Sequence, residues 1–210
     1  LRALGVTAPI VVIPNGVETR PLPGVDRPKS RTVLFMSRIH EKKGVAELVA
    51  AWRRLKPSDW KMVIAGPDES NMIPALNLSD SDRIEFVGEV SGEDKWRLLE
   101  SASVFVLPTH SENFGLVIAE ALMAGTPVIT THGAPWQILA EKRAGWWIPM
   151  NVDSVEKSLR QAIAMPMSEL ADMGLRGHHL VVERFGWQQI GQQMLDVYRS
   201  LLRSSPSLQV

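Results

Sequence analysis

The sequence has no cysteine, no excess of charge of either sign and no long apolar run. The absence of cysteine excludes a disulfide framework and thiolate chemistry, and it is compatible with a reducing compartment. Basic and acidic side chains number 23 each, so the net charge is zero and we expect no nucleic-acid partner. No run approaches the roughly 18 apolar residues that a membrane-spanning helix requires.

The composition that remains fits a soluble globular protein, with 45% hydrophobic and 22% charged residues in 210. This length suits one large domain, or one domain with appended helices. Residues 1–13 do not resemble a secretory signal, and position 1 is not methionine. We therefore expect that the chain has been cut or processed.

Short apolar runs alternate with helical patterns along the chain. The apolar runs predict strands at 32–36, 61–65, 83–87, 104–107, 127–130 and 146–148. Apolar spacing predicts helices at 44–55, 91–101, 116–123, 155–164, 168–185 and 187–202. Ser91 with Asp94 three residues on resembles the start of a helix, which supports the second of them. This alternation predicts an α/β fold, a Rossmann-like doubly wound parallel sheet with C-terminal helices.

The sequence divides into three segments. Residues 1–30 are predicted to hold an N-terminal strand at 10–13 and a linker of interdomain type, rich in proline and glycine. Residues 31–185 form the Rossmann-like domain, and residues 186–210 form a closing helix and tail. In such sheets ligands bind at the carboxyl ends of the strands, so the residues after each strand carry the functional prediction.

Two cations flank the loop after the first predicted strand, Arg38 directly beyond the strand and Lys43 just before the helix. Their position at a strand–loop–helix unit suits an anion such as a diphosphate. The alternative is a solvated basic loop, since Glu41 lies between them. The loop lacks the glycines and the Lys-Ser/Thr pair of a Walker A sequence.

Two glutamates follow the fourth predicted strand. Glu112 lies in the loop, and Glu120 lies more than one turn into the next helix, which begins near Gly115. Free backbone N–H groups at 115–117 could donate to phosphate oxygens, and a carboxylate at Glu120 could accept from two ribose hydroxyls. Glu120 could also be an ordinary helix glutamate, but its largely apolar surroundings imply that its carboxylate needs a partner.

Three further features of the sequence lie near predicted strand ends. The sequence Asp80-Ser81-Asp82 matches an Asp-x-Asp motif that can bind a metal ion, but it precedes a strand and is interpreted as a turn or capping segment. His110 and His132 lie on predicted ligand-side loops and could touch a sugar. Gly133 indicates a close backbone approach or a sharp turn.

The combination resembles the retaining glycosyltransferases of family 4 with the GT-B fold, also called glycosyl transferases group 1. The resemblance covers nearly the whole chain and implies that these residues correspond to the C-terminal, donor-binding domain of such an enzyme. It rests on Glu112 and Glu120 within Glu-Asn-Phe-Gly-Leu-Val-Ile-Ala-Glu-Ala, on Arg38 and Lys43 in an Arg-x4-Lys-Gly pair, and on Pro-Asn-Gly at 14–16.

The resemblance implies a role for each of these residues. Glu120 would bind the ribose, Glu112 would contact the 3- and 4-hydroxyls of the donor sugar, and Arg38 and Lys43 would hold the diphosphate. We therefore name Glu112, Arg38 and Lys43 as catalytic candidates. The predicted substrate-binding residues are Glu120, Gly115, Leu116, Phe114, Asn113, Val117 and Gly16. No metal and no cofactor is expected, since the nucleoside diphosphate sugar is the substrate.

The sequence departs from the family pattern at two places. Ser37 stands where many members have glycine, and Gly-Ala-Pro-Trp-Gln at 133–137 stands where many have Gly-Gly-x-Pro-Glu, so Gln137 receives no role. The Pro-Trp-Gln sequence and Gly-Trp-Trp at 145–147 look like members that act on lipopolysaccharide or related polysaccharides.

The implied function is transfer of a sugar from a UDP- or GDP-sugar to a glycan or lipid-linked acceptor, with retention. The acceptor would bind a first domain that these 210 residues lack, so we expect the chain alone to transfer little sugar. A cytoplasmic location is implied, and peripheral membrane association of the full-length protein is compatible with it.

Three alternative functions remain open: a nucleotide-sugar epimerase of similar fold, a dinucleotide dehydrogenase, and a non-catalytic nucleotide- or glycan-binding module. The dehydrogenase would need Gly-x-Gly-x-x-Gly after the first strand, and the sequence there does not provide it. The sequence leaves the base, sugar, acceptor and oligomeric state open.

Overall fold

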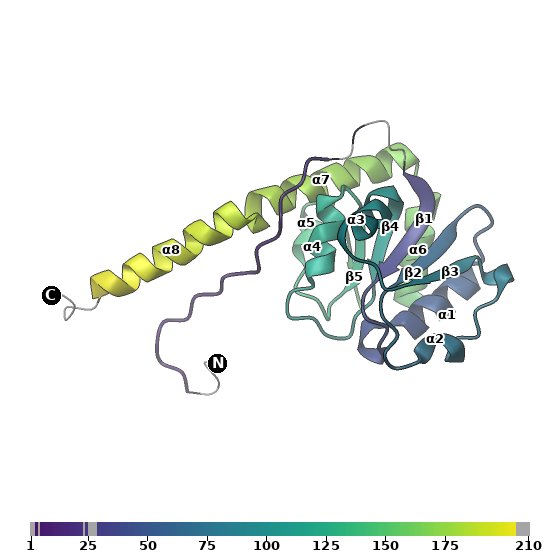
Figure 1. The fold of residues 1–210 in the computed structure, drawn as a ribbon, viewed down its shortest axis with the longest axis horizontal. Helices are drawn as coiled ribbons and strands as arrows, with labels where there is room; N and C mark the ends of the chain where they lie inside the picture. The colour runs from purple at the N-terminus through teal and green to yellow at the C-terminus, as the bar shows by residue number, and fades with distance from the viewer. Residues whose placement is uncertain (1–2, 4, 23, 25–28, 205–210) are drawn as a thin grey trace.

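A computed structural model describes residues 3, 5–22, 24 and 29–204 (Figure 1). Its centre is a parallel sheet of six strands in the order β3-β2-β1-β4-β5-β6. The strands are β1 (Ser30–Met36), β2 (Lys61–Ala65), β3 (Ile84–Gly88), β4 (Ala102–Leu107), β5 (Val128–Thr131) and β6 (Gly145–Ile148). The predicted doubly wound parallel sheet is confirmed.

Helices cover both faces of this sheet. They are α1 (Val45–Leu55), α2 (Met72–Ala75), α3 (Gly92–Ser101), α4 (Leu116–Met123), α5 (Ile138–Glu141), α6 (Val152–Ala164), α7 (Met167–Phe185) and α8 (Trp187–Ser204). Because parallel crossovers are right-handed and the strand order reverses after β3, α1 and α2 lie on one face and α3, α4 and α5 on the other. α6 packs against α1, α7 packs against α4, and α8 extends away from the sheet (Figure 1).

The six strands and six longer helices begin and end within three residues of their predicted bounds. The sequence did not predict α2 and α5, nor two 3₁₀ turns, η2 (Glu41–Lys43) and η3 (Asp80–Asp82). These elements have four residues or fewer, which is too short for a helical apolar period to be visible.

The predicted N-terminal strand is wrong. Residues 10–13 form no strand in the described part of the chain, and Val11 and Val12 are exposed. An apolar run becomes a strand only where a neighbouring strand accepts its backbone hydrogen bonds, and this run has none beside it. The first pairing comes later, where Val17 forms a parallel bridge with Gly186 and its N–H donates to the carbonyl of Phe185 at 2.8 Å. Most of the predicted linker, at 23 and 25–28, lies outside the described residues.

The junction between α7 and α8 coincides with the predicted boundary at 185–186. α8 has an exposed apolar side, which includes Trp187, Leu195, Tyr198, Leu201 and Leu202. No helix in the described part of the chain is long and apolar enough to cross a bilayer.

At the amino edge of the sheet, Lys29 joins the start of β1 to the ends of two helices. Its ammonium group donates to Thr126 Oγ1 at 2.6 Å and to the carbonyls of Glu100 and Ala102 at 3.1 Å. Burial lowers the pKa of Lys29 to about 8. The carbonyl ends of α3 and α4 are thereby held together around one cation.

Candidate functional site

β1 and β4 are neighbours in the sheet, but the chain leaves them toward opposite faces. This is the position where ligands bind in doubly wound sheets. The two loops that follow these strands touch backbone to backbone. A Cβ atom on Gly44, which has a φ of 70°, would lie 2.0 Å from the carbonyl oxygen of Pro108. The carbonyl of Lys42 accepts from the N–H of His110 at 2.8 Å and from Thr109 Oγ1 at 2.9 Å.

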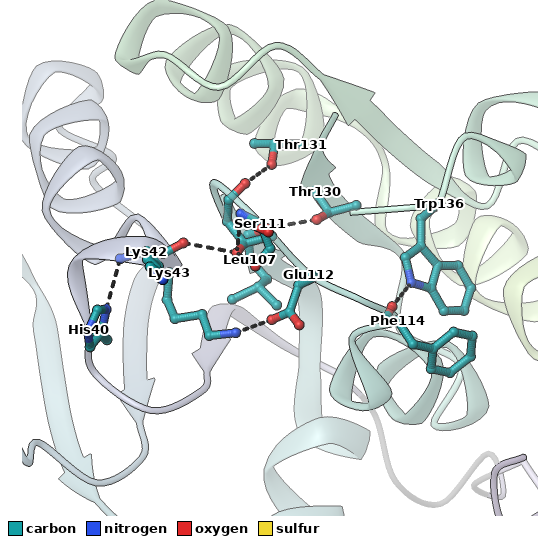
Figure 2. A network of polar contacts seen from close by, with 11 residues as sticks. His40, Lys42, Lys43, Leu107, Ser111, Glu112, Phe114, Thr130, Thr131 and Trp136 are labelled. Atoms are coloured by element: carbon teal, nitrogen blue, oxygen red, sulfur yellow. Dashed lines mark hydrogen bonds and ion pairs between the residues drawn. The ribbon is translucent and has the colours of Figure 1, made fainter. Parts of the chain in front are cut away.

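The loop after β5 joins the same junction. The N–H of Glu112 donates to the carbonyl of Gly133 at 2.8 Å, and Thr130 Oγ1 donates to the carbonyl of Leu107 at 2.8 Å (Figure 2). A Cβ on Gly133 would lie 2.5 Å from the carbonyl oxygens of Thr109 and His110. The prediction of a close backbone approach at Gly133 is confirmed, and the approach is between two loops of the protein.

Lys43 and Glu112 meet across this junction in an ion pair (Figure 2). Their side chains are only 14% and 16% exposed, so the pair is largely shielded from water. The sequence assigned the lysine to a diphosphate and the glutamate to a sugar, as separate groups. The structure shows that they form one ion pair, in which each neutralises the other, because a buried charge needs a partner.

The start of α4 presents backbone donors next to this pair. Gly115, with a φ of 79°, is the N-cap residue, and because it has no side chain it leaves the first N–H groups of the helix uncapped. The N–H groups of Leu116 and Val117 have no acceptor within the helix, because the first turn of any helix lacks them. Leu116 is exposed and Val117 packs partly against the core. This end of α4 therefore has the geometry of an anion site.

Phe114 anchors the loop before α4 from the protein side. Its carbonyl accepts from Trp136 Nε1 at 2.5 Å, and its ring lies 5.3 Å from the Trp136 ring and 5.5 Å from that of Phe185, centroid to centroid. Its side chain is thus part of an aromatic cluster. Its neighbour Asn113 is exposed.

Glu120 has a protein partner that the sequence did not reveal. Lys95 of α3 donates to Glu120 Oε1 at 2.8 Å, and the two side chains are 27% and 22% exposed. The prediction that this carboxylate needs a partner is confirmed. Lys95 was missed because it lies 25 residues away on another helix. The sequence shows only a lysine in a helix that follows a strand, and lysines are common on solvent-exposed helices, so this residue did not stand out.

Arg38 and Gly16 differ in their relation to the junction. Arg38 follows β1 directly and is exposed, and no described residue holds its guanidinium in a hydrogen bond or ion pair. Gly16 packs against the start of α8: a Cβ there would lie 2.5 Å from the ring of Trp187. Its contact with substrate stays a prediction.

The histidines have structural partners. His110 Nε2 lies 3.1 Å from Glu47 Oε1, the ring of His132 lies 4.1 Å from that of Trp147, and buried His178 bonds to the carbonyl of Met123 at 2.7 Å. Within the described part of the chain, no three His, Asp or Glu side chains are grouped so as to hold a metal ion.

The Asp80–Asp82 segment is a capping turn, as predicted. Ser79 and Asp82 form a capping box at the start of η3. Arg53 donates to Asp82 through Nε at 3.0 Å and Nη2 at 2.7 Å. These bonds from Arg53 lower the pKa of Asp82 to about 2. The carboxylate is therefore fully engaged by the protein.

The fold and this charged junction define a doubly wound domain that gathers charged side chains and a helix start at its switch point. Residues 24–178 match the model of the family Glycosyl transferases group 1. That match spans well over half of the 210 residues, and the chain belongs to this family.

Two curated relatives are both 30% identical to the chain. One is an uncharacterized glycosyltransferase of Methanocaldococcus jannaschii, matched over 80% of this chain and 45% of the relative. The other is a phosphatidyl-myo-inositol mannosyltransferase of Mycolicibacterium smegmatis, matched over 100% of this chain and 56% of the relative. The chain spans about half the length of the curated relatives that it matches.

Solved structures share the fold. A sucrose-phosphate synthase of Thermosynechococcus elongatus has a TM-score of 0.75 and 26% identity, over 92% of this chain and 53% of that chain. WaaG, a glycosyltransferase involved in lipopolysaccharide biosynthesis, has a TM-score of 0.72 and 19% identity, over 86% and 54%. HepE of Anabaena, in complex with UDP and glucose, has a TM-score of 0.70 and 21% identity, over 82% and 49%. The last two show the fold alone.

Proposed function

We propose that this chain binds the nucleoside diphosphate sugar donor of a retaining glycosyltransferase. In the whole protein the donor sugar would pass to a glycan or lipid-linked acceptor. One observation carries the proposal: the β1–β4 switch point gathers a lysine, a shielded glutamate and the free N–H groups of a helix start within loops that touch each other. This is the chemistry that a diphosphate joined to a hydroxyl-rich group requires.

The diphosphate would lie at the start of α4. The N–H groups of Leu116 and Val117 would donate to its oxygens, Arg38 would swing in from its exposed position, and Lys43 would supply a second positive charge. These groups would stabilise the charge that grows on the leaving diphosphate as the bond to the sugar breaks. We propose that they do so without a metal ion.

Binding would add a ligand partner to each glutamate of the two ion pairs. As the diphosphate attracts Lys43, the carboxylate of Glu112 becomes available to accept from a sugar hydroxyl. Glu120 keeps Lys95 on one oxygen and offers its second oxygen to the ribose. Each carboxylate thus has a cation in the free protein and gains a hydroxyl partner in the complex, so neither is left unpaired.

Calorimetric titration with UDP, GDP, ADP and NAD tests the proposal. We expect binding of one nucleoside diphosphate, weakened at least tenfold by Glu120→Gln and by Arg38→Ala, and unchanged by EDTA. Arg54→Ala serves as a matched control, since Arg54 forms an exposed pair with Asp153 on the helix face. Tight NAD binding, or diphosphate binding that ignores both substitutions, would contradict the assignment. Loss of binding in EDTA would overturn metal independence alone.

The finer parts of the proposal concern the whole protein. We propose action in polysaccharide or lipopolysaccharide assembly on the cytoplasmic side of the membrane, supported by the Gly-Trp-Trp sequence at 145–147. The acceptor would be bound by a further domain, so these 210 residues should bind donor and transfer little sugar. The epimerase alternative has no support in the comparisons. Efficient transfer by the 210 residues would contradict this division of labour.

A further inference from the structure

The first turn of α3 has no cap of its own. Ser91 is its N-cap residue but makes no side-chain hydrogen bond, and Gly92 follows with a φ of 53°. The helix start predicted at Ser91 is confirmed, but the Ser91 side chain does not cap it. Asp94 instead pairs with exposed Arg97 at 2.6 Å. A helix start without a local cap depends on contacts from elsewhere for a fixed position.

Arg20 provides such a contact from the N-terminal segment. Its Nη2 donates to Glu93 Oε1 at 2.7 Å and its Nη1 to Glu93 Oε2 at 3.4 Å. The guanidinium carbon also lies 4.3 Å from the centroid of the Trp96 ring. The backbone of Arg20 is itself attached to α4, since its N–H donates to Met123 Sδ at 3.4 Å. The Arg20 side chain thus contacts Glu93 in the first turn of α3 and Trp96 in the next turn, while its backbone contacts the end of α4.

Lys95, the partner of Glu120, directly precedes Trp96 in α3. Its ammonium nitrogen lies 5.5 Å from the Trp96 centroid and 2.8 Å from Glu120 Oε1. Arg20 and Lys95 therefore share one indole ring. Since Trp96 is 6% exposed, the ring is a fixed reference for both cations.

We propose that Arg20 is a positioning residue for the nucleotide site. By holding Glu93 and stacking on Trp96, it fixes the first turn of α3 and so sets the reach of Lys95 to Glu120. The carboxylate of Glu120 is then oriented before the ligand arrives. This inference rests on the proposed function, because it assigns Arg20 an effect only through the role of Glu120 in binding a nucleotide.

Arginine suits this role in a way that lysine does not. A planar guanidinium forms two bonds to one carboxylate and lies flat on an aromatic ring at the same time, whereas an ammonium group is a single point of charge. Orientation matters at Glu120 because Lys95 holds one carboxylate oxygen, and only a fixed orientation presents the other oxygen to the ribose. Loss of Arg20 should therefore weaken ligand binding without removing any atom that touches the ligand.

A double-mutant cycle tests the proposal. The affinity for UDP and GDP is measured calorimetrically in the full chain, in Arg20→Ala, in Glu120→Gln and in the double variant. We expect Arg20→Ala to weaken the better ligand about fivefold in the parent, and less than twofold when Glu120 is already glutamine. Arg20→Lys should restore only part of the affinity. Glu93→Gln should reproduce part of the loss, and Arg54→Ala should leave affinity unchanged.

The outcomes of the cycle distinguish the positioning role of Arg20 from the proposed nucleotide-binding function. An equal loss from Arg20→Ala in both backgrounds, or no loss in either, would overturn the positioning role and leave the proposed function intact. An affinity that Glu120→Gln does not change would overturn the proposed function, and the positioning role with it. Thermal unfolding of the same variants shows whether the helix start is merely destabilised, in which case affinity would fall in both backgrounds alike.

Discussion

Ion pairs at the two edges of the sheet differ in how completely the protein surrounds them. Before the amino end of β3, Asp82 accepts two bonds from Arg53 and one from the N–H of Ser79, and Arg53 also donates to the carbonyls of Leu76 and Asn77. At the carboxyl edge, Glu112 and Glu120 each have one lysine, and in the described structure Arg38 has no polar partner.

This difference separates structural charge from charge kept for a ligand. The pair at the amino edge has its hydrogen-bonding capacity filled by backbone and side chains, so it fixes the turn before β3. At the carboxyl edge, Glu112 and Glu120 are largely shielded from water and retain oxygen lone pairs beyond those that accept from their lysines. Four predictions test whether the two edges divide stability and binding between them.

The largest effect is expected from removal of both phosphate cations. The double variant Arg38→Ala, Lys43→Ala should lose about 3 kcal/mol of binding free energy for the nucleoside diphosphate, more than a hundredfold in affinity, because hydrogen bonds to charged groups each contribute about 1.5–3 kcal/mol. Competition against a labelled nucleotide would measure it. An affinity within tenfold of the parent would show that the helix start alone holds the anion.

The next effect concerns the amino edge. Asp82→Ala should lower the free energy of unfolding by about 2 kcal/mol, between the values for exposed and buried pairs, because Arg53 is 38% and Asp82 12% exposed. Urea unfolding measures this, and nucleotide affinity should stay unchanged. If Asp82→Ala lowered nucleotide affinity and left the free energy of unfolding unchanged, Asp82 would serve binding and not stability.

A smaller effect should appear in acid. The pKa of Asp82 is about 2 in the folded protein against an ordinary 3.8, so the folded state binds fewer protons between these values. Its stabilisation is complete above about pH 4 and is lost as the pH falls toward 2. Urea unfolding of the parent and of Asp82→Asn should give curves that converge over this interval. A difference that stays constant with pH would contradict the assigned cause.

The smallest effect on stability is expected at the carboxyl edge. Glu112→Gln keeps the shape of the side chain and a carbonyl oxygen for Lys43, so the free energy of unfolding should change by less than about 1 kcal/mol. Sugar transfer by the whole protein should fall steeply while nucleotide affinity remains. A stability loss as large as that of Asp82→Ala would show that the Lys43–Glu112 pair is structural.

The long helices and strands, and the residues at the carboxyl edge of the sheet, were predictable because they depend on the spacing of apolar residues along the chain. The apolar run of β4 and the spacing in α4 place Glu112 and Glu120 near the carboxyl edge with no tertiary information. The short helices α2 and α5 were not predictable, and neither was the failure of residues 10–13 to form a strand. Those outcomes depend on neighbours that are remote in sequence.

The sequence by itself determined which residues reach the carboxyl edge, because strand and helix periods fix where each element ends. Only the tertiary structure decided their partners. Lys43 meets Glu112 from 69 residues away, Lys95 meets Glu120 from 25, and Arg20 meets Glu93 from 73. Partner choice follows from how strands are ordered and helices packed, and the period of a pattern carries no information about that order. The two glutamates and Lys43 were visible in the sequence as candidates, while the ion pairs that hold the glutamates were visible only in the fold.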